Sequence, residues 1–366
     1  LCRRRLANDI RDTSVDDDVC GVHPTRNMSR ESMSVSGQAP TAPTGISPSL
    51  RNALADSVPS RAPSPAPPVT LAPVGHEHAP RMVLELADKT ELQGISFGAE
   101  GKSVSGECVF QTGMVGYVES LTDPSYEGQI LVLTYPLVGN YGVPARPASD
   151  DEVPKLKAPF ESSRIHVAAL VVAYYSHDFS HYLAASGLSD WLKEQGVPAV
   201  YGIDTRALTK RIRTKGSMLG RLLTLQPHAP MDENNWRQRM IDVPWHDPNG
   251  ENLVARVSRK TPMLFTPQDT QPAGLREANE PTLMHASGRP IRIMALDLGM
   301  KRNQIRCFTS RGVELKVVPF DHDILSETEP YDGLFLSNGP GDPTHCMSTL
   351  ERVRALISRQ TDVNPD

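Results

Sequence analysis

The sequence has few aromatic residues, no long apolar run and no strong excess of one charge. Aromatic residues make up 5% of the 366 positions, which is low for one uniformly packed globule. No apolar run approaches the length of a membrane span, so no membrane partner is expected. The net charge of -5 at pH 7 provides no electrostatic basis for binding nucleic acid. The length is sufficient for two or more domains, each with its own core.

Cysteines are also scarce, and their spacing excludes two kinds of site. The chain has five, and none lies in a CxxC pair, so we expect neither a disulfide framework nor a metal site. His177 and His181 are four residues apart but lack a third ligand nearby in the sequence. Arginines at residues 3–5 resemble part of a mitochondrial transit peptide, but the aspartates at residues 16–18 argue against one. We therefore predict a cytoplasmic protein.

Residues 1–80 are predicted to be a disordered tail. Proline recurs there among serine, threonine and alanine, and apolar clusters are almost absent. Such a segment cannot bury enough apolar surface to offset the loss of backbone entropy on folding.

A mixed α/β domain is predicted over residues 82–225. Short apolar segments separated by polar turns indicate strands: they are residues 82–86, 92–97, 106–111, 129–134 and 166–173. Ser180 is expected to cap a helix that runs to Gln195, with Tyr182 on its apolar side. Asp204 is expected to cap a second helix over Thr205–Lys215, which Gly216 ends.

A connector over residues 226–289 precedes a second domain over residues 290–366. In the connector, Leu253–Val257 is predicted to form a short strand. In the second domain strands alternate with helices, which predicts a doubly wound parallel sheet: the strands are residues 291–297, 313–318 and 333–337, and the helices follow at residues 301–311 and after Cys346. Asp297 and the pair Asn338 and Gly339 then lie at one sheet edge, because parallel strands share the edge at which they end.

The segment Asn-Gly-Pro-Gly-Asp-Pro, residues 338–343, is the most informative motif. A glycine turn after a buried strand delivers backbone N–H groups to an anion or oxyanion. An ordinary tight turn is an equally good interpretation on physical grounds alone. The turn holds no nucleophile, and Cys346 beyond it lacks the glycine-flanked elbow that exposes one.

A polar loop over residues 120–128 offers a second candidate. Ser125 or Asp123 could contact a ligand there, although Asp123 before Pro124 is also typical of a simple turn. His166 begins an apolar strand, and we interpret it as a hydrogen-bonded core histidine rather than a catalyst.

Several longer motifs resemble a known family. FQTGMVGY (residues 110–117), LTDPSY (121–126), LTYPLVGNYG (133–142) and GIDTRALT (202–209) resemble the small-subunit region of carbamoyl-phosphate synthase. KRNQIRC (301–307) and LSNGPGDP (336–343) resemble the opening of its class I glutamine amidotransferase domain. The segments at residues 303–307 and 216–222 resemble most the eukaryotic pyrimidine-pathway form, with the arginine-pathway small subunit as the alternative.

The resemblance implies the reaction and the residues that bind its substrate. A cysteine attacks the amide of L-glutamine, a histidine moves protons, and a glutamate orients the histidine. Ser125, Gly339 and Gly341 match positions that contact glutamine, and the Gly339 N–H matches the oxyanion hole. Ammonia then passes to a fused or separate synthase region, where ATP, bicarbonate and a divalent metal are used. No cofactor is expected in this chain.

The chain departs from the family pattern at the catalytic residues. The family's Gly-x-Cys-x-Gly elbow, histidine and glutamate have no counterpart in residues 1–366, so we expect this chain alone not to hydrolyse glutamine. The second domain would stop within its sheet and have an uncovered strand edge, which predicts poor stability. Two other functions remain open: a non-catalytic protein that docks onto a synthase, and a module that binds glutamine without reaction.

Overall fold

The computed structural model describes residues 81–149, 159–224, 236–268 and 282–363. These residues lie in one compact unit, Thr70–Asp366. The predicted tail, residues 1–80, lies outside the described residues. No helix among those described is both long and apolar enough to cross a membrane.

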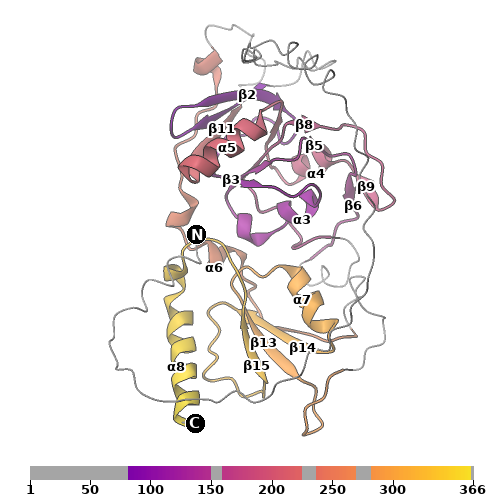
Figure 1. Cartoon of the computed structure of the whole chain (residues 1–366), viewed down its shortest axis with the longest axis vertical. Helices are drawn as coiled ribbons and strands as arrows, with labels where there is room; N and C mark the ends of the chain where they lie inside the picture. The colour runs from indigo at the N-terminus through magenta and orange to yellow at the C-terminus, as the bar shows by residue number, and fades with distance from the viewer. Residues whose placement is uncertain (1–80, 150–158, 225–235, 269–281, 364–366) are drawn as a thin grey trace, which may run out of the picture. The chain divides into compact units, whose positions relative to one another are not determined.

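The first part of the described chain is a closed barrel (Figure 1). In spatial order its strands are β1 (Arg81–Leu86), β11 (Met218–Thr224), β3 (Val104–Gln111), β4 (Ile130–Leu133), β7 (Ala169–Val171), β10 (Ala199–Tyr201) and β2 (Glu91–Ser96). β1 and β2, both predicted as strands, form an antiparallel hairpin. All four residues of β4 are buried: Ile130 and Val132 join one apolar cluster, whereas Leu131 and Leu133 join the other. Alternate residues of a strand point to opposite faces, so this apolar run supplies cores on both sides of the barrel wall.

The helix predicted after Asp204 is confirmed. α5 (Thr205–Lys215) begins where the Asp204 carboxylate accepts a hydrogen bond from the Ala207 N–H at 2.9 Å. It ends at Gly216, whose φ of 91° suits glycine. The remaining helices of this part are α3 (Tyr117–Leu121), η1 (Pro124–Tyr126) and α4 (Leu188–Glu194).

The prediction of a helix from Ser180 to Gln195 was wrong for the first two turns. α4 begins only at Leu188, after Gly187. The preceding residues form β9 (Ala184–Ser186), which pairs with β6 (Val143–Pro144). Tyr182, expected on the apolar side of the helix, is 88% exposed. Pairing with a distant strand therefore overrode the helical spacing of the apolar residues. A second small ladder joins β5 (Leu137–Val138) to β8 (Tyr174–Tyr175).

The strand predicted at Leu253–Val257 was also wrong, because this segment is the helix α6. The Asn252 side chain accepts a hydrogen bond from the Ala255 N–H at 2.9 Å, which caps the helix. Leu253 and Val254 are buried on its inner side. In the sequence, η3 (Trp236–Arg239) and η4 (Pro248–Gly250) precede α6, and β12 (Met263–Phe265) follows it.

The second sheet has the order β12-β14-β13-β15, with β13 (Arg292–Asp297), β14 (Glu314–Pro319) and β15 (Gly333–Leu336). β13 is parallel to both neighbours, as predicted, whereas β12 joins β14 antiparallel from the connector. α7 (Arg302–Thr309) contributes to the apolar cluster on one face. α8 (Met347–Val363), which follows η5 (Pro343–Cys346), contributes to the other. Helices on both faces of parallel strands confirm the predicted α/β class. Within the described residues, β15 is an edge strand.

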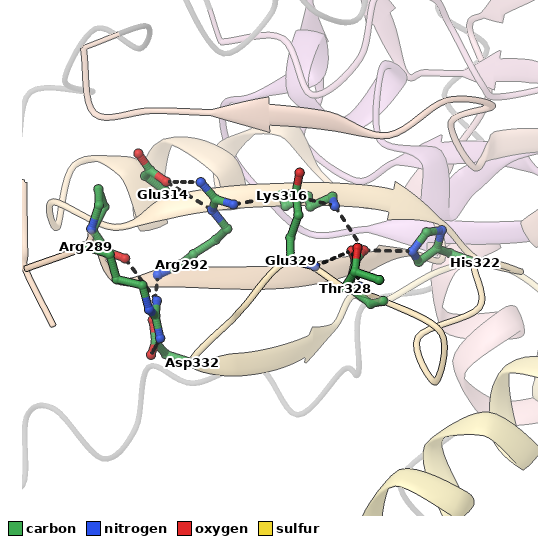
Figure 2. A network of polar contacts seen from close by, with 10 residues as sticks. Arg289, Arg292, Glu314, Lys316, His322, Thr328, Glu329 and Asp332 are labelled. Carbon is green, nitrogen blue, oxygen red and sulfur yellow. Dashed lines mark hydrogen bonds and ion pairs between the residues drawn. The ribbon is translucent and has the colours of Figure 1, made fainter. Parts of the chain in front are cut away.

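A network of ion pairs connects β13 and β14 to the segment before β15 (Figure 2). Lys316 pairs with Glu327 and Glu329, each at 3.0 Å. Arg292 pairs with Glu329 at 3.2 Å and with Glu314 at 2.9 Å. The network therefore holds together segments that are separate in the sequence.

Candidate functional site

The glycine turn follows β15 at the edge where β13 also ends. The two strands are in parallel register, with Leu296 opposite Leu336. Just beyond them, the Ser337 N–H donates to the Leu296 carbonyl at 3.3 Å, and the Ser337 hydroxyl accepts from the Leu298 N–H at 3.0 Å. The loops after β13 and β15 are thus held side by side at one edge of the sheet.

Glycine is required where these loops touch. A Cβ atom at residue 339 would lie 1.7 Å from the Leu298 carbonyl oxygen, a backbone atom that cannot move aside cheaply. Gly299 has a φ of 118°, and a Cβ there would lie 2.8 Å from Cδ of Pro340. Residue 339 is therefore glycine because the neighbouring backbone leaves no room for a side chain, and not only because a turn needs a flexible residue.

The N–H groups of the turn are available to a ligand. Asn338 and Gly339 are exposed. Neither the Gly339 N–H nor the Gly341 N–H has a hydrogen-bond acceptor among the described residues. Gly341 has a φ of 78°, which a non-glycine residue adopts only with strain. A fixed and unpaired N–H at a strand end is the geometry that stabilises an oxyanion.

Ser125 lies in η1, which Asp123 caps. The Asp123 Oδ1 atom accepts from the Ser125 N–H at 2.9 Å, and Oδ2 pairs with Lys301 Nζ at 2.6 Å. Burial alone would lower the pKa of Lys301, but the ion pair with Asp123 and the nearby Glu161 raise it. Asp123 is 4% exposed, so this charged pair fixes the loop that carries Ser125.

Lys301 therefore joins the two predicted parts of the site. It comes directly before α7 and belongs to the loop in which Gly299 touches Gly339 and Pro340. Among the described residues, no hydrogen bond joins Ser125 directly to either glycine of the turn. The roles of Ser125, Gly339 and Gly341 in binding remain a prediction, but the loops that carry them are connected.

Asp297, expected at the site edge, supports the backbone there. Its Oδ1 atom accepts from the N–H groups of Gly299 at 3.0 Å and Met300 at 2.8 Å. Its Oδ2 atom accepts from the Arg259 N–H at 3.0 Å. Asp297 is fully buried, so it shapes the loop beside Gly339 rather than facing a ligand. Sequence reasoning did not identify this role or that of Lys301. An aspartate directly before a Leu-Gly pair was the available signal for a local turn.

His166, Cys346 and Cys108 are structural. His166 is 6% exposed, and its ring nitrogens contact the Glu127 carboxylate at 2.6 Å and the Ser162 hydroxyl at 2.9 Å, as expected of a core histidine. Burial raises the pKa of the Cys346 thiol and raises that of Cys108 to about 12. Neither thiol is suited to act as a nucleophile at neutral pH. Among the described residues, no three histidine, cysteine or acidic side chains are grouped so as to hold a metal ion.

Comparisons with known proteins agree with the motifs. Residues 84–222 match the family model described as carbamoyl-phosphate synthase small chain, CPSase domain. Residues 294–363 match the model described as glutamine amidotransferase class-I. Gly339 and Gly341 lie in the second match, and Ser125 lies in the first.

Individual relatives show high identity over most of the chain. The multifunctional protein ura1 of Schizosaccharomyces pombe is 54% identical over 287 residues, which cover 76% of this chain and 12% of that protein. The multifunctional protein URA2 of Saccharomyces cerevisiae is 55% identical over 304 residues, 81% of this chain and 13% of that protein. The carbamoyl phosphate synthase arginine-specific small chain of Saccharomyces cerevisiae is 43% identical over 266 residues, 73% of this chain and 57% of that protein.

The chain thus spans about an eighth of the length of the multifunctional relatives. Both family matches lie within its described part, apart from one internal gap. Residues 84–222 therefore belong to the carbamoyl-phosphate synthase small-chain family, and residues 294–363 belong to the class I glutamine amidotransferase family.

Proposed function

We propose that this chain provides the glutamine-binding part of a glutamine-hydrolysing carbamoyl-phosphate synthase. The observation that carries the proposal is the exposed, unpaired N–H of Gly339, held at a strand end by its contact with Leu298. This N–H would stabilise the oxyanion formed when a thiolate attacks the amide of glutamine. Gly341 would contact glutamine from the same turn, and Ser125 would contact it from the neighbouring loop.

The nucleophilic cysteine, the histidine and the glutamate would come from sequence outside residues 1–366. Cys108 and Cys346 are buried, and neither follows a strand in a glycine-flanked elbow. The ammonia released would pass to a synthase region, fused or separate, where ATP and a divalent metal are used. We propose no cofactor for the residues of this chain and a cytoplasmic location.

The pyrimidine pathway is the proposed destination of the carbamoyl phosphate, and the arginine pathway is the alternative. Identity to the two yeast multifunctional proteins is 54% and 55%, whereas identity to the arginine-specific small chain is 43%. We also propose the domain division predicted from the sequence: a first domain over residues 82–225, a connector over residues 226–289 and a second domain over residues 290–366.

Replacing Gly339 with alanine in the complete gene product tests the proposal. The added Cβ collides with the Leu298 carbonyl and displaces the oxyanion N–H, so glutamine-dependent carbamoyl phosphate synthesis should fall by about 100-fold. Synthesis from added ammonium should remain near the wild-type rate, because the synthase region does not need the glycine turn. Gly250→Ala is the matched control, since a Cβ there meets open space. Equal glutamine-dependent rates for Gly339→Ala and Gly250→Ala would refute the role of Gly339.

A further inference from the structure

A cavity lined by basic side chains lies apart from the exposed N–H groups of the glycine turn. Its volume is about 260 Å³. It is formed by η1, the loop before β7, α6 with the turn that follows it, and the first residue of α7. Five cationic side chains line it: Arg164, Arg256, Arg259, Lys260 and Arg302. We propose that this cavity binds a small molecule that carries a phosphate group.

No acidic side chain is among the described residues that line the cavity, and the carboxylates that pair with its cations lie behind them. Glu127 is shared by Arg164 at 3.0 Å and Arg256 at 2.9 Å, and Arg256 also pairs with Glu251 at 3.0 Å. Asp297 lies 3.7 Å from Arg302. Within the described residues, Lys260 Nζ donates to the Ala255 carbonyl and pairs with no carboxylate. The described lining is therefore positive, and an anion would relieve the repulsion between its side chains.

A buried carboxylate fixes the positions of two guanidinium groups in the lining. The Glu127 side chain is 4% exposed and also contacts His166. Burial alone would raise the pKa of Glu127, but His166, Arg164 and Arg256 outweigh burial and lower it. Glu127 therefore stays ionised and holds Arg164 and Arg256 in place before a ligand binds. Preorganised donors of this kind reduce the entropy lost on binding.

The chemistry of the lining favours phosphate over other anions. Guanidinium groups present paired N–H donors that match phosphate oxygens, and they are weakly hydrated. The cavity is near the small end of ligand sites, which excludes a folded nucleic acid or a protein segment as the occupant. A small phosphoester or diphosphate fits both the size and the charge.

The cavity adjoins the two loops that the Asp123–Lys301 ion pair connects. Pro124, in the lining, directly precedes Ser125, and Arg302 directly follows Lys301. The inference nevertheless stands without the proposed function, because it depends only on the cavity and its charges.

Calorimetric titration of the chain with pyrophosphate tests the inference. The variant Arg259→Gln/Lys260→Gln removes two of the five positive charges without changing Glu127 or its partners. The matched control is Arg206→Gln/Lys210→Gln, which removes two exposed charges from α5 and leaves the same net charge. Pyrophosphate should bind the wild type at one site, and the cavity variant should bind it about tenfold more weakly. The control variant should bind like the wild type.

Three results would overturn the inference. The first is the absence of binding heat with the wild type. The second is an equal loss of affinity in both double variants, which would indicate attraction to the general surface charge. The third is equally tight binding of succinate, which would show that the site does not select phosphate. Circular dichroism of each variant establishes that it is folded before titration.

Discussion

The carboxylate of Glu327 should contribute a measurable and pH-dependent share of the stability of the second sheet. Its Oε2 atom pairs with Lys316 at 3.0 Å and His322 at 3.2 Å. Its Oε1 atom accepts from the N–H groups of Thr328 at 3.0 Å and Glu329 at 3.1 Å. The side chain is 7% exposed, so these contacts are poorly screened by water. Figure 2 shows His322, Lys316, Thr328 and Glu329 gathered in this network.

The magnitude follows from the pKa of Glu327. Burial alone would raise this pKa, but the Glu329 N–H, Lys316 and His322 outweigh burial and lower it to about 2. The ordinary value is 4.5, so the ionised form is favoured in the folded state by up to about 3 kcal/mol. Because His322 is partly exposed, we expect about 2 kcal/mol.

The substitution Glu327→Gln leaves one oxygen that can accept from the backbone N–H groups. It replaces the oxygen that pairs with Lys316 by an uncharged NH2 group, so the ion pair is lost. At pH 7 the variant should unfold with a free energy about 2 kcal/mol lower than that of the wild type. The carboxylate has a lowered pKa in the folded state, so its contribution is complete above pH 4.5 and is lost as the pH falls toward 2. The difference between wild type and variant should therefore shrink over that pH range.

Urea unfolding followed by far-ultraviolet circular dichroism measures the difference at pH 7, 4 and 2.5. Hydrogen exchange at pH 7 locates the lost protection, which should concentrate in β13, β14 and the segment before β15. Glu329→Gln is the matched control, because Glu329 is 56% exposed and its two ion pairs should contribute less than about 1 kcal/mol. Equal losses in both variants, or a difference that persists at pH 2.5, would refute the argument.

Three further predictions concern the cap of α5, the barrel core and catalysis. Asp204→Ala removes the cap of α5 and should lower the free energy of unfolding by about 1 kcal/mol in urea, whereas Arg206→Ala should change it little. Leu170→Ala empties a fully buried position and should lower the melting temperature, with a loss of about 3 kcal/mol, whereas the partly exposed Leu137→Ala should lose under about 1 kcal/mol. A polypeptide limited to residues 1–366 should release no ammonia from glutamine in a coupled assay, and activity above background would contradict the assignment of the nucleophile to other sequence.

Local signals in the sequence were sufficient where neighbouring residues decide the structure. α5 has its aspartate cap, its apolar residues at helical spacing and its terminal glycine within one short segment. The hairpin of β1 and β2 is likewise formed by segments adjacent in the chain. The prediction was wrong where pairing with a distant strand determines the structure. The residues before Leu188 pair with β6 instead of starting a helix. At α6 the signal was local, since Asn252 is a good cap, but the apolar run was interpreted as a strand.

The sequence by itself determined the fold class and the residues proposed to bind glutamine, because the alternation of strands and helices and the motif around Gly339 are readable along the chain. Only the tertiary structure showed why residue 339 must be glycine, since the atom that excludes a side chain is the carbonyl oxygen of Leu298 in another loop. Tertiary structure alone also joined Asp123 to Lys301 and gathered the cations around one cavity. The physical reason is that backbone clashes and ion pairs depend on distances in space, which folding sets between residues far apart in the sequence.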